Sequence, residues 1–274
     1  MAHSSRAIEL SSVNLRFAGI SALSSVSVAI EMDEIVAVVG PNGAGKSSLL
    51  NCISGLYRAD SGNIAVLGHD VTKRPPEYIA RLGVGRTFQH PELLFSDGTV
   101  FDNVMLGRHL RSRPGFWRDM LRLPSVVQLE AADRKIVDRS LDYLGLMEIR
   151  LERPTRLPYG TQKLVEFARA LATEPKVMLL DEPSTGMSSG ERGPLQDAII
   201  GLRRDLGIAT MVIEHDLAVV NAVASRVVVM DFGQIIAAGT FAEVMQAPQV
   251  RAAYLGEPAT ESLDEPVEHG TNTL

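Results

Sequence analysis

A glycine-rich segment followed by a lysine and two serines carries the strongest chemical signal in this sequence. The letters IVAVVGPNGAGKSSLL predict a strand, a loop and a helix in direct succession. Glycines let the loop turn tightly, so that successive N–H groups point into one concavity, and the helix adds its positive N-terminal end. The full spacing favours a nucleotide triphosphate site over a purely structural turn. The predicted nucleotide-binding residues are Gly40, Pro41, Asn42, Gly43, Ala44, Gly45, Lys46, Ser47 and Ser48.

Two carboxylates at the end of another strand extend this chemistry from binding to hydrolysis. We expect Lys46 to reach the β- and γ-phosphates and the Ser47 hydroxyl to ligate Mg²⁺. The apolar strand in KVMLLDEP ends in Asp181 and Glu182, a costly carboxylate pair unless it binds a cation or does chemistry. Asp181 is therefore expected to hold magnesium through a water, and Glu182 to act as general base on the attacking water. An acid that caps a following helix is the simpler alternative.

Three further side chains are candidates because of where they stand in the chain. His215 ends the apolar strand in TMVIEHD, which predicts a γ-phosphate contact, although a lone histidine is often a surface or core residue. Gln89 follows the strand VGRTF; it is either a surface amide or the group whose oxygen completes the magnesium shell. Phe17 lies upstream of the loop and is expected either to stack on adenine or to lie in the core. The predicted catalytic residues are Lys46, Gln89, Glu182 and His215.

A layered α/β arrangement is needed to bring these strand ends together. After Ile35, continuous apolar runs alternate with helical stretches, which predicts a parallel sheet covered by helices, with nucleotide-binding turns at the strand C-termini. The segments 8–17 and 23–30 alternate polar and apolar residues, as half-buried antiparallel strands do. Residues 97–144 are mostly helical in pattern. The predicted fold class is α/β, with a mixed sheet core, an antiparallel β subdomain and an α-helical subdomain.

Composition excludes several classes of protein. The 274 residues carry a net charge of −6, which argues against a protein that coats nucleic acid. No run of about 18 apolar residues is free of charges, and the start lacks the regions of a signal peptide, so we expect a soluble cytoplasmic chain. Cys52 has no disulfide partner and is expected to pack on a buried helix face. The scattered histidines offer no zinc-ligand pair.

Two segments are expected to lie outside the compact fold. Residues 109–128 are basic and contain Trp117 and prolines; they are interpreted as a variable surface loop, or as a short helix that contacts a membrane protein or lipid head groups. Residues 257–274 contain several acids and no lysine or arginine, which is typical of a disordered acidic tail.

The ordered motifs GPNGAGKS, Gln89, LPYGTQ, VMLLDEP and His215 span nearly the whole chain, and together they resemble the ATP-binding cassette (ABC) family. The resemblance implies a P-loop NTPase fold of ABC type in a single domain, residues 1–256, with its helical subdomain at about 90–172. It also implies ATP hydrolysis with Mg²⁺. EPSTGM stands at the position of the D-loop. The signature motif, which contacts the ATP of a partner cassette, corresponds to Leu157, Pro158, Tyr159, Gly160 and Thr161.

The closing segment DFGQIIAAGTFAEVMQAPQVRAAYLG is similar to the ATPases of branched-chain amino acid importers. The resemblance implies that two cassettes close head to tail, with each ATP between one phosphate loop and the partner's signature. Closure would move transmembrane permease subunits at the cytoplasmic face of the cell membrane, and a solute-binding protein would take part indirectly. A lipid or lipopolysaccharide exporter is the alternative. Cassette ATPases of DNA repair or translation are disfavoured, because sustained heptads and a second cassette are missing.

The chain departs from the family pattern at two places. In the signature, Pro158 stands where a serine is usual and Tyr159 replaces a glycine; in the D-loop, Ser188 stands where an aspartate is usual. The signature thereby loses a hydroxyl that would face the partner's γ-phosphate. We therefore expect a heterodimer with unequal ATP sites, with a homodimer as the alternative. The more active site would use Lys46, Glu182 and His215 of this chain.

Overall fold

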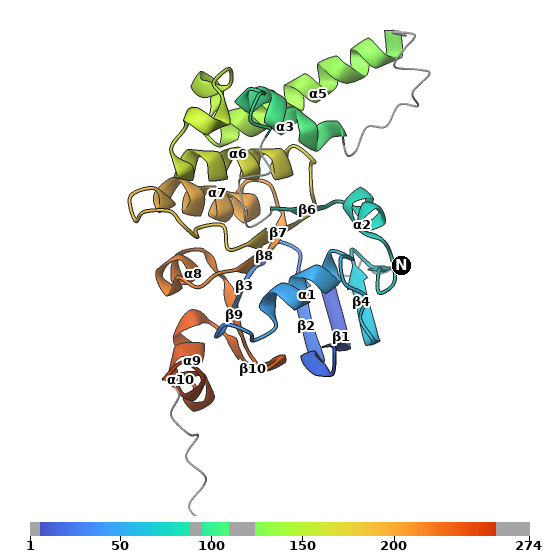
Figure 1. The fold of residues 1–274 in the computed structure, drawn as a ribbon, viewed down its shortest axis with the longest axis vertical. Coiled ribbons are helices and arrows are strands. Elements are labelled where there is room, and N and C mark those ends of the chain that lie inside the picture. The colour runs from blue at the N-terminus through green and yellow to red at the C-terminus, as the bar shows by residue number, and fades with distance from the viewer. Residues whose placement is uncertain (1–5, 88–94, 110–123, 256–274) are drawn as a thin grey trace, which may run out of the picture.

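The computed structural model describes residues 6–87, 95–109 and 124–255, whose strands form two sheets with a group of helices at one end (Figure 1). The strands are β1 (Arg6–Phe17), β2 (Ile20–Glu31), β3 (Ile35–Val39), β4 (Ser61–Val66), β5 (His69–Asp70), β6 (Val84–Arg86), β7 (Val177–Asp181), β8 (Ala209–Ile213), β9 (Arg226–Asp231) and β10 (Gln234–Gly239). The helices are α1 (Lys46–Ile53), α2 (Pro76–Leu82), α3 (Val100–His109), α5 (Pro124–Tyr143), α6 (Tyr159–Leu171), α7 (Arg192–Arg204), α8 (Leu217–Val223), α9 (Phe241–Gln246) and α10 (Pro248–Leu255). Short 3₁₀ turns lie at Met147–Ile149 and Pro154–Arg156.

A six-stranded mixed sheet forms the centre, in the order β10-β9-β3-β8-β7-β6. Strands β9, β3, β8, β7 and β6 run parallel, and β10 pairs with β9 antiparallel. Every residue of β3, β7 and β8 is buried, which explains their continuous apolar sequences. Because parallel strands end at one edge, the turns after β3, β7 and β8 meet there.

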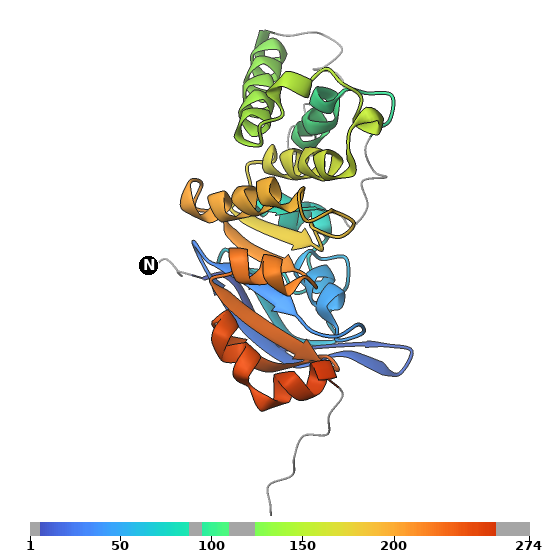
Figure 2. The ribbon, with the colours of Figure 1, turned by 90° about the vertical axis from the view of Figure 1, so that its left-hand side faces the viewer.

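The central sheet is buried on both faces because its strands alternate their side chains between two cores. In β3, Val36 and Val38 pack with the antiparallel strands and α1, whereas Ile35, Ala37 and Val39 pack with the helices of the other face. The sheet therefore lies between two apolar layers, and the helices that follow β7 and β8 cover one of them (Figure 2). This arrangement fixes the strand ends that carry the candidate site.

A four-stranded antiparallel sheet in the order β2-β1-β4-β5 packs against α1 and the central sheet. Both β1 and β2 alternate buried and exposed residues over most of their length, with register shifts where the alternation breaks. The alternating pattern in the sequence thus identified these strands correctly. The predicted fold class, a mixed sheet with an antiparallel β subdomain and a helical subdomain, is confirmed.

Helices α3, α5 and α6 lie together beyond the central sheet (Figure 1). A β-carbon at Gly107 would lie 2.3 Å from the Arg169 carbonyl oxygen, so glycine permits the close crossing of α3 and α6. Buried Arg108 donates to Asp133 Oδ1 at 2.7 Å and to the Ala172 carbonyl at 2.8 Å, which ties α3 to α5 and to the end of α6. These contacts hold the C-terminal end of α6, whereas the signature motif lies at the opposite end of this helix.

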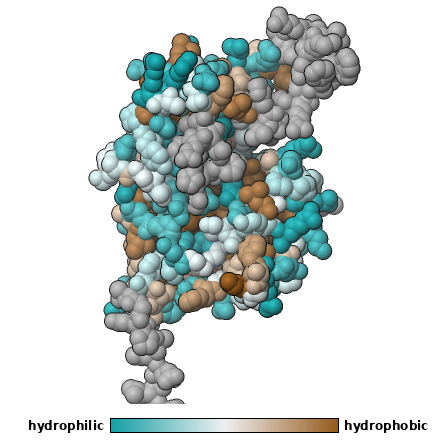
Figure 3. Space-filling model, in the orientation of Figure 1, coloured by the Kyte–Doolittle hydropathy of each residue, from teal (hydrophilic) through white to brown (hydrophobic). Residues whose placement is uncertain are grey.

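The two segments predicted to leave the compact fold are only partly described. Helix α5 begins at Pro124, inside the predicted insertion 109–128, while residues 110–123 lie outside the described part, as does the predicted tail 257–274. Among the described helices, none combines the length and apolar character needed to cross a bilayer. Polar side chains cover much of the face shown in Figure 3, and apolar ones form small separate groups.

Candidate nucleotide-hydrolysing site

The phosphate loop connects β3 to α1, and its glycines are required by close backbone contacts. Gly40 and Gly45 have φ angles of 148° and 96°. A β-carbon at Gly40 would lie 2.0 Å from the Met230 carbonyl oxygen, and one at Gly45 would lie 2.4 Å from the Ala22 carbonyl oxygen. Gly45 is the N-cap of α1 and has no side chain to satisfy the first-turn amides. Those amides therefore remain suited to an external anion.

Lys46, the first residue of α1, points into this loop. Its side chain is buried, and its Nζ donates to the carbonyl oxygens of Gly40 and Pro41, each at 2.8 Å. Burial lowers the pKa of Lys46, and the negative charge of Glu182 partly opposes this effect. The lysine ammonium group is thus held among the backbone groups that would surround a phosphate.

Asp181 ends β7 and is buried next to an arginine that the sequence reasoning missed. Arg86, at the end of neighbouring β6, places Nη2 at 3.1 Å from Asp181 Oδ2 and donates from Nη1 to Ser54 Oγ at 2.7 Å. Burial lowers the pKa of Arg86, and Asp181 opposes that shift. The only available signal was an arginine that ends a short strand in VGR, and this does not reveal its partner.

Glu182 and His215 come from the ends of adjacent strands and contact each other directly. His215 Nε2 lies 2.6 Å from Glu182 Oε1, and Thr185 Oγ1 donates to Glu182 Oε2 at 3.3 Å. Glu182 has a φ of 48°, uncommon for a residue with a side chain, and its N–H donates to the Ile213 carbonyl at 2.9 Å. The structure therefore brings the predicted base and the predicted γ-phosphate histidine together, although their chemical roles remain predictions.

A second missed carboxylate, Glu214, organises the backbone around this pair. It is almost fully buried and accepts hydrogen bonds from the N–H groups of Ser184 at 2.9 Å and His215 at 3.2 Å. Burial raises the pKa of Glu214, and the hydrogen bonds from Ser184 partly offset this rise. The available signal was a charged residue directly after an apolar strand, but the adjacent His215 was predicted as the functional residue.

Phe17 is exposed, so the alternative that placed it in the core is wrong. Its ring meets the ring of Tyr57 edge to face, with the centroids 5.0 Å apart. Gln89 lies outside the described residues. Cys52 is buried on α1, as expected, and burial raises the pKa of its thiol to about 11.

Helix α6 begins inside the predicted signature motif. It runs from Tyr159 to Leu171, and Pro158 occupies the N-cap position. Gly160 is therefore inside the first turn, and its N–H donates to Glu191 Oε1 at 3.2 Å. Leu157 precedes the N-cap in extended conformation. Glu191, which follows the D-loop, was not recognised as part of this site.

The predicted magnesium ligands have suitable chemistry. Ser47 presents an exposed hydroxyl on the first turn of α1, and Asp181 supplies a carboxylate oxygen. Magnesium is typically held by one or two carboxylates together with substrate phosphates, so few protein ligands are required. No group of three His, Cys, Asp or Glu side chains gathers as a metal site in the described part of the chain.

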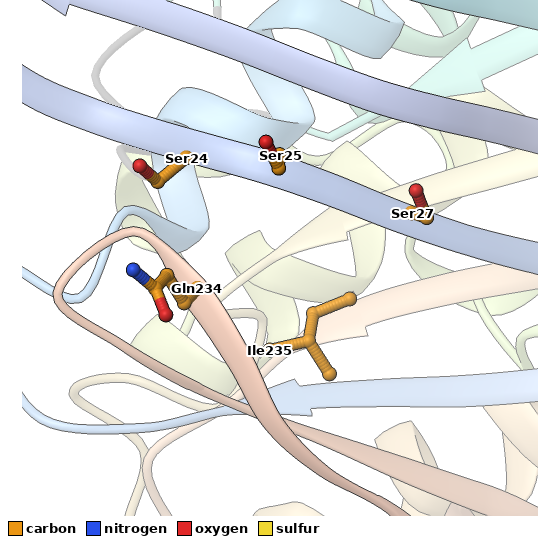
Figure 4. A pocket seen from close by; sticks show the side chains of 5 residues that line it. All are labelled: Ser24, Ser25, Ser27, Gln234 and Ile235. Carbon is orange, nitrogen blue, oxygen red and sulfur yellow. The ribbon is translucent and has the colours of Figure 1, made fainter.

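A hollow of about 440 Å³ lies elsewhere, between β2 and β10 (Figure 4). Its lining contains none of the predicted nucleotide-binding residues; it consists of Ser24, Ser25, Ser27, Gln234 and Ile235. This hollow does not mark the nucleotide site, because an open loop for phosphate need not form a deep pocket.

A phosphate loop at the C-terminal edge of a parallel sheet, with a carboxylate–histidine pair on nearby strands, defines an α/β protein of the P-loop type. Residues 23–185 match the family described as ABC transporter, and residues 234–260 match the one described as branched-chain amino acid ATP-binding cassette transporter. This chain therefore belongs to the ABC transporter ATP-binding family, whose members bind and hydrolyse ATP.

Individual relatives agree with this assignment. The chain is 36% identical over 245 residues to the high-affinity branched-chain amino acid transport ATP-binding protein LivG of Salmonella typhimurium, covering 89% of this chain and 95% of LivG. It is 32% identical to BraF of Pseudomonas aeruginosa, covering 91% and 98%. The crystal structure of the ADP conformation of an ABC transporter cassette superimposes with a TM-score of 0.81 at 30% identity, covering 93% of this chain and all of that one.

Proposed function

We propose that this chain is the ATP-hydrolysing subunit of an ABC importer for branched-chain or related amino acids. The names of the similar proteins and the match of residues 234–260 support this substrate class. A sulfate/thiosulfate import protein of Chromobacterium violaceum is also 36% identical, over 88% of this chain and 61% of its own length. Similar cassettes are thus named for different solutes, as expected if the solute contacts permease subunits and a solute-binding protein.

The contact between Glu182 and His215 beside the phosphate loop carries the proposal. With ATP bound, Lys46 would contact the β- and γ-phosphates, and Glu182 would take a proton from the attacking water. His215 Nε2 lies 2.6 Å from Glu182 Oε1, and His215 would contact the γ-phosphate. Ser47 and Gln89, with Asp181 through a water, would hold magnesium, whose charge would offset that of the phosphates.

A membrane-bound partner is proposed for the helical end of the chain. Exposed apolar side chains occur there on or beside α3, α5 and the 3₁₀ turns, which supports contact with permease subunits at the cytoplasmic face. They are Phe95, Leu106, Leu129 and Leu151. A second cassette is the other proposed partner, since the signature of one chain would complete the ATP site of the other.

The ATP sites of this pair are proposed to be unequal. Pro158 has no hydroxyl to offer a partner's γ-phosphate, and the Ser188 hydroxyl donates to Glu191 at 2.7 Å within its own chain. The site that uses this chain's Glu182 and the partner's signature would then hydrolyse faster. Mutating the catalytic glutamate of each cassette separately tests this, and equal loss of turnover from the two changes would contradict it.

Replacement of Glu182 by glutamine tests the proposed function itself. Glu182→Gln should keep Mg-ATP binding, lower phosphate release by at least about 100-fold, and yield an ATP-dependent closed pair on size-exclusion chromatography. Glu243→Gln, at the distant N-terminus of α9, is a matched control that should behave as the parent chain. Normal turnover in Glu182→Gln would exclude Glu182 as the base.

A further inference from the structure

The signature motif and the segment from the D-loop to Glu191 are held together by two reciprocal close contacts. The Tyr159 ring covers Gly186, where a β-carbon would lie 2.8 Å from the ring. In the opposite direction Glu191 covers Gly160, where a β-carbon would lie 2.9 Å from the Glu191 carboxylate. Each glycine thus allows the approach of a side chain from the other segment of the same chain.

Glu191 supplies the helix cap that Pro158 cannot. Proline has no side-chain acceptor, and α6 has no side-chain hydrogen bond from its N-cap. The two carboxylate oxygens of Glu191 accept hydrogen bonds from different residues. Oε1 accepts from Gly160 N–H at 3.2 Å, while Oε2 accepts from the Ser188 N–H at 2.9 Å and from its hydroxyl at 2.7 Å. These hydrogen bonds hold the pKa of Glu191 below its usual value, and those from Ser188 have the largest effect. The group is therefore an anion near neutral pH.

An anion at this amide conflicts with the proposed role of the signature. If the α6 terminus receives the γ-phosphate of the partner's ATP, that phosphate and the Glu191 carboxylate would compete for one amide and repel each other. We propose that the Glu191 carboxylate binds the N-terminus of the signature helix until the partner's ATP displaces it during closure. This inference rests on the proposed function. Glu191 is a positioning residue, since it acts through Gly160 and Ser188.

Displacement of the Glu191 carboxylate would also affect the hydrolytic site of the same chain. The next residue, Arg192, pairs through Nη1 with the carboxylate of Asp216, the N-cap of α8. Asp216 directly follows His215, which contacts Glu182. The neighbouring side chains of Glu191 and Arg192 therefore connect the signature helix to the segment that holds the proposed base.

The test compares Glu191→Gln with the parent, both in the Glu182→Gln background and with the partner cassette present. Glutamine keeps the shape of the side chain and removes its charge. The ATP concentration for half-maximal closure should fall by about two- to fivefold at low salt, the range of charge effects at exposed helix termini. The difference should disappear near 1 M salt, where the screening length is about 3 Å. A merely structural role would not depend on salt in this way.

Glu243→Gln is the matched control, because Glu243 also accepts from a backbone N–H at a helix terminus and is remote from α6. It should leave the ATP requirement unchanged. An unchanged or higher ATP requirement in Glu191→Gln would overturn the inference while leaving the proposed function intact. Failure of the Glu182→Gln parent to close with ATP would refute both.

Hydrogen exchange provides a measurement that does not depend on closure. Without nucleotide, the Gly160 amide should exchange faster in Glu191→Ala than in the parent, because the carboxylate that accepts from it is removed. Equal exchange in the two proteins would show that Glu191 does not hold this amide, and the inference would fail.

Discussion

Two helix N-termini in this chain face the same proposed chemistry but are prepared for it in opposite ways. At α1, the N-cap is a glycine and the first helical residue is the cation Lys46, whose Nζ donates to the Gly40 carbonyl. At α6, the N-cap is a proline, and the amide of Gly160 is already bonded to the anion Glu191. The first terminus is ready for a phosphate, whereas the second must release a carboxylate first. On the proposed mechanism, ATP binding and closure of the pair would therefore be separable steps.

The two termini also differ in what fixes them. The loop before α1 is set by backbone, since the β-carbons excluded at Gly40 and Gly45 would strike carbonyl oxygens. The turn before α6 is set by the side chains of Tyr159 and Glu191, which change rotamer far more easily than a backbone segment moves. A rigid site for the nucleotide is thus combined with a signature that can be switched.

Removal of the cation at the first terminus should have the largest effect. Lys46→Ala should weaken Mg-ATP binding about 10- to 100-fold, the value of a hydrogen bond to a charged group, as measured by calorimetry on the isolated chain. Lys73→Ala, which removes an exposed lysine beside α2, is the control and should bind normally. Unchanged affinity in Lys46→Ala would remove the distinction between the two helix termini.

Backbone rigidity at the first terminus is tested by two alanine substitutions. Gly43 and Gly45 both have positive φ, but a β-carbon at Gly43 meets nothing within 4 Å, whereas one at Gly45 meets the Ala22 carbonyl. Gly43→Ala should cost about 1–2 kcal/mol of unfolding free energy through strain alone. Gly45→Ala should cost about 3 kcal/mol or more, since overpacking adds to the strain. Denaturant unfolding without nucleotide measures both, and equal costs would contradict a loop held by backbone contacts.

Sequence patterns predicted the first terminus far better than the second. The phosphate loop is contiguous, and its strand, glycines and helix are all visible in one segment. Strand ends could also be matched, because parallel strands place Glu182 and His215 at one edge. By contrast, Glu191 meets Gly160 across 31 residues, and no periodicity relates two such side chains. Contacts of this kind depend on how helices pack after they form.

The same limit explains the other omissions. Arg86 pairs with Asp181 because β6 and β7 are neighbours in the sheet, an order that the sequence does not state. Glu214 was overlooked because its partners are backbone N–H groups of a turn, which carry no sequence signal. The start of α6 inside the signature follows from Pro158, whose fixed φ suits a position at the beginning of a helix.

The cap at the second terminus should give a smaller effect that depends on pH. The pKa of Glu191 in the folded chain lies below its ordinary value of 4.5, so the carboxylate stabilises the folded state above that value. This stabilisation is lost as the pH falls through the lowered pKa. Glu191→Ala should therefore lower the Tm at pH 7, and the difference from the parent should shrink in acid. A constant difference across this range would mean that packing, not charge, is what Glu191 contributes.

Restoring a side-chain cap at α6 should change the stability least. It also tests most directly whether residues 158 and 191 serve the same helix end. Pro158 has φ −52° and ψ 149°, an extended conformation in which a serine hydroxyl can reach the first-turn amides. Pro158→Ser alone should change the unfolding free energy by less than about 1 kcal/mol, because the gained cap is offset by the flexibility that proline had removed. Combined with Glu191→Ala, it should recover most of the lost Tm, since both groups serve the same helix end. Additive effects of the two substitutions would show that they act independently. The second terminus would then be held by packing, as the first is by its backbone.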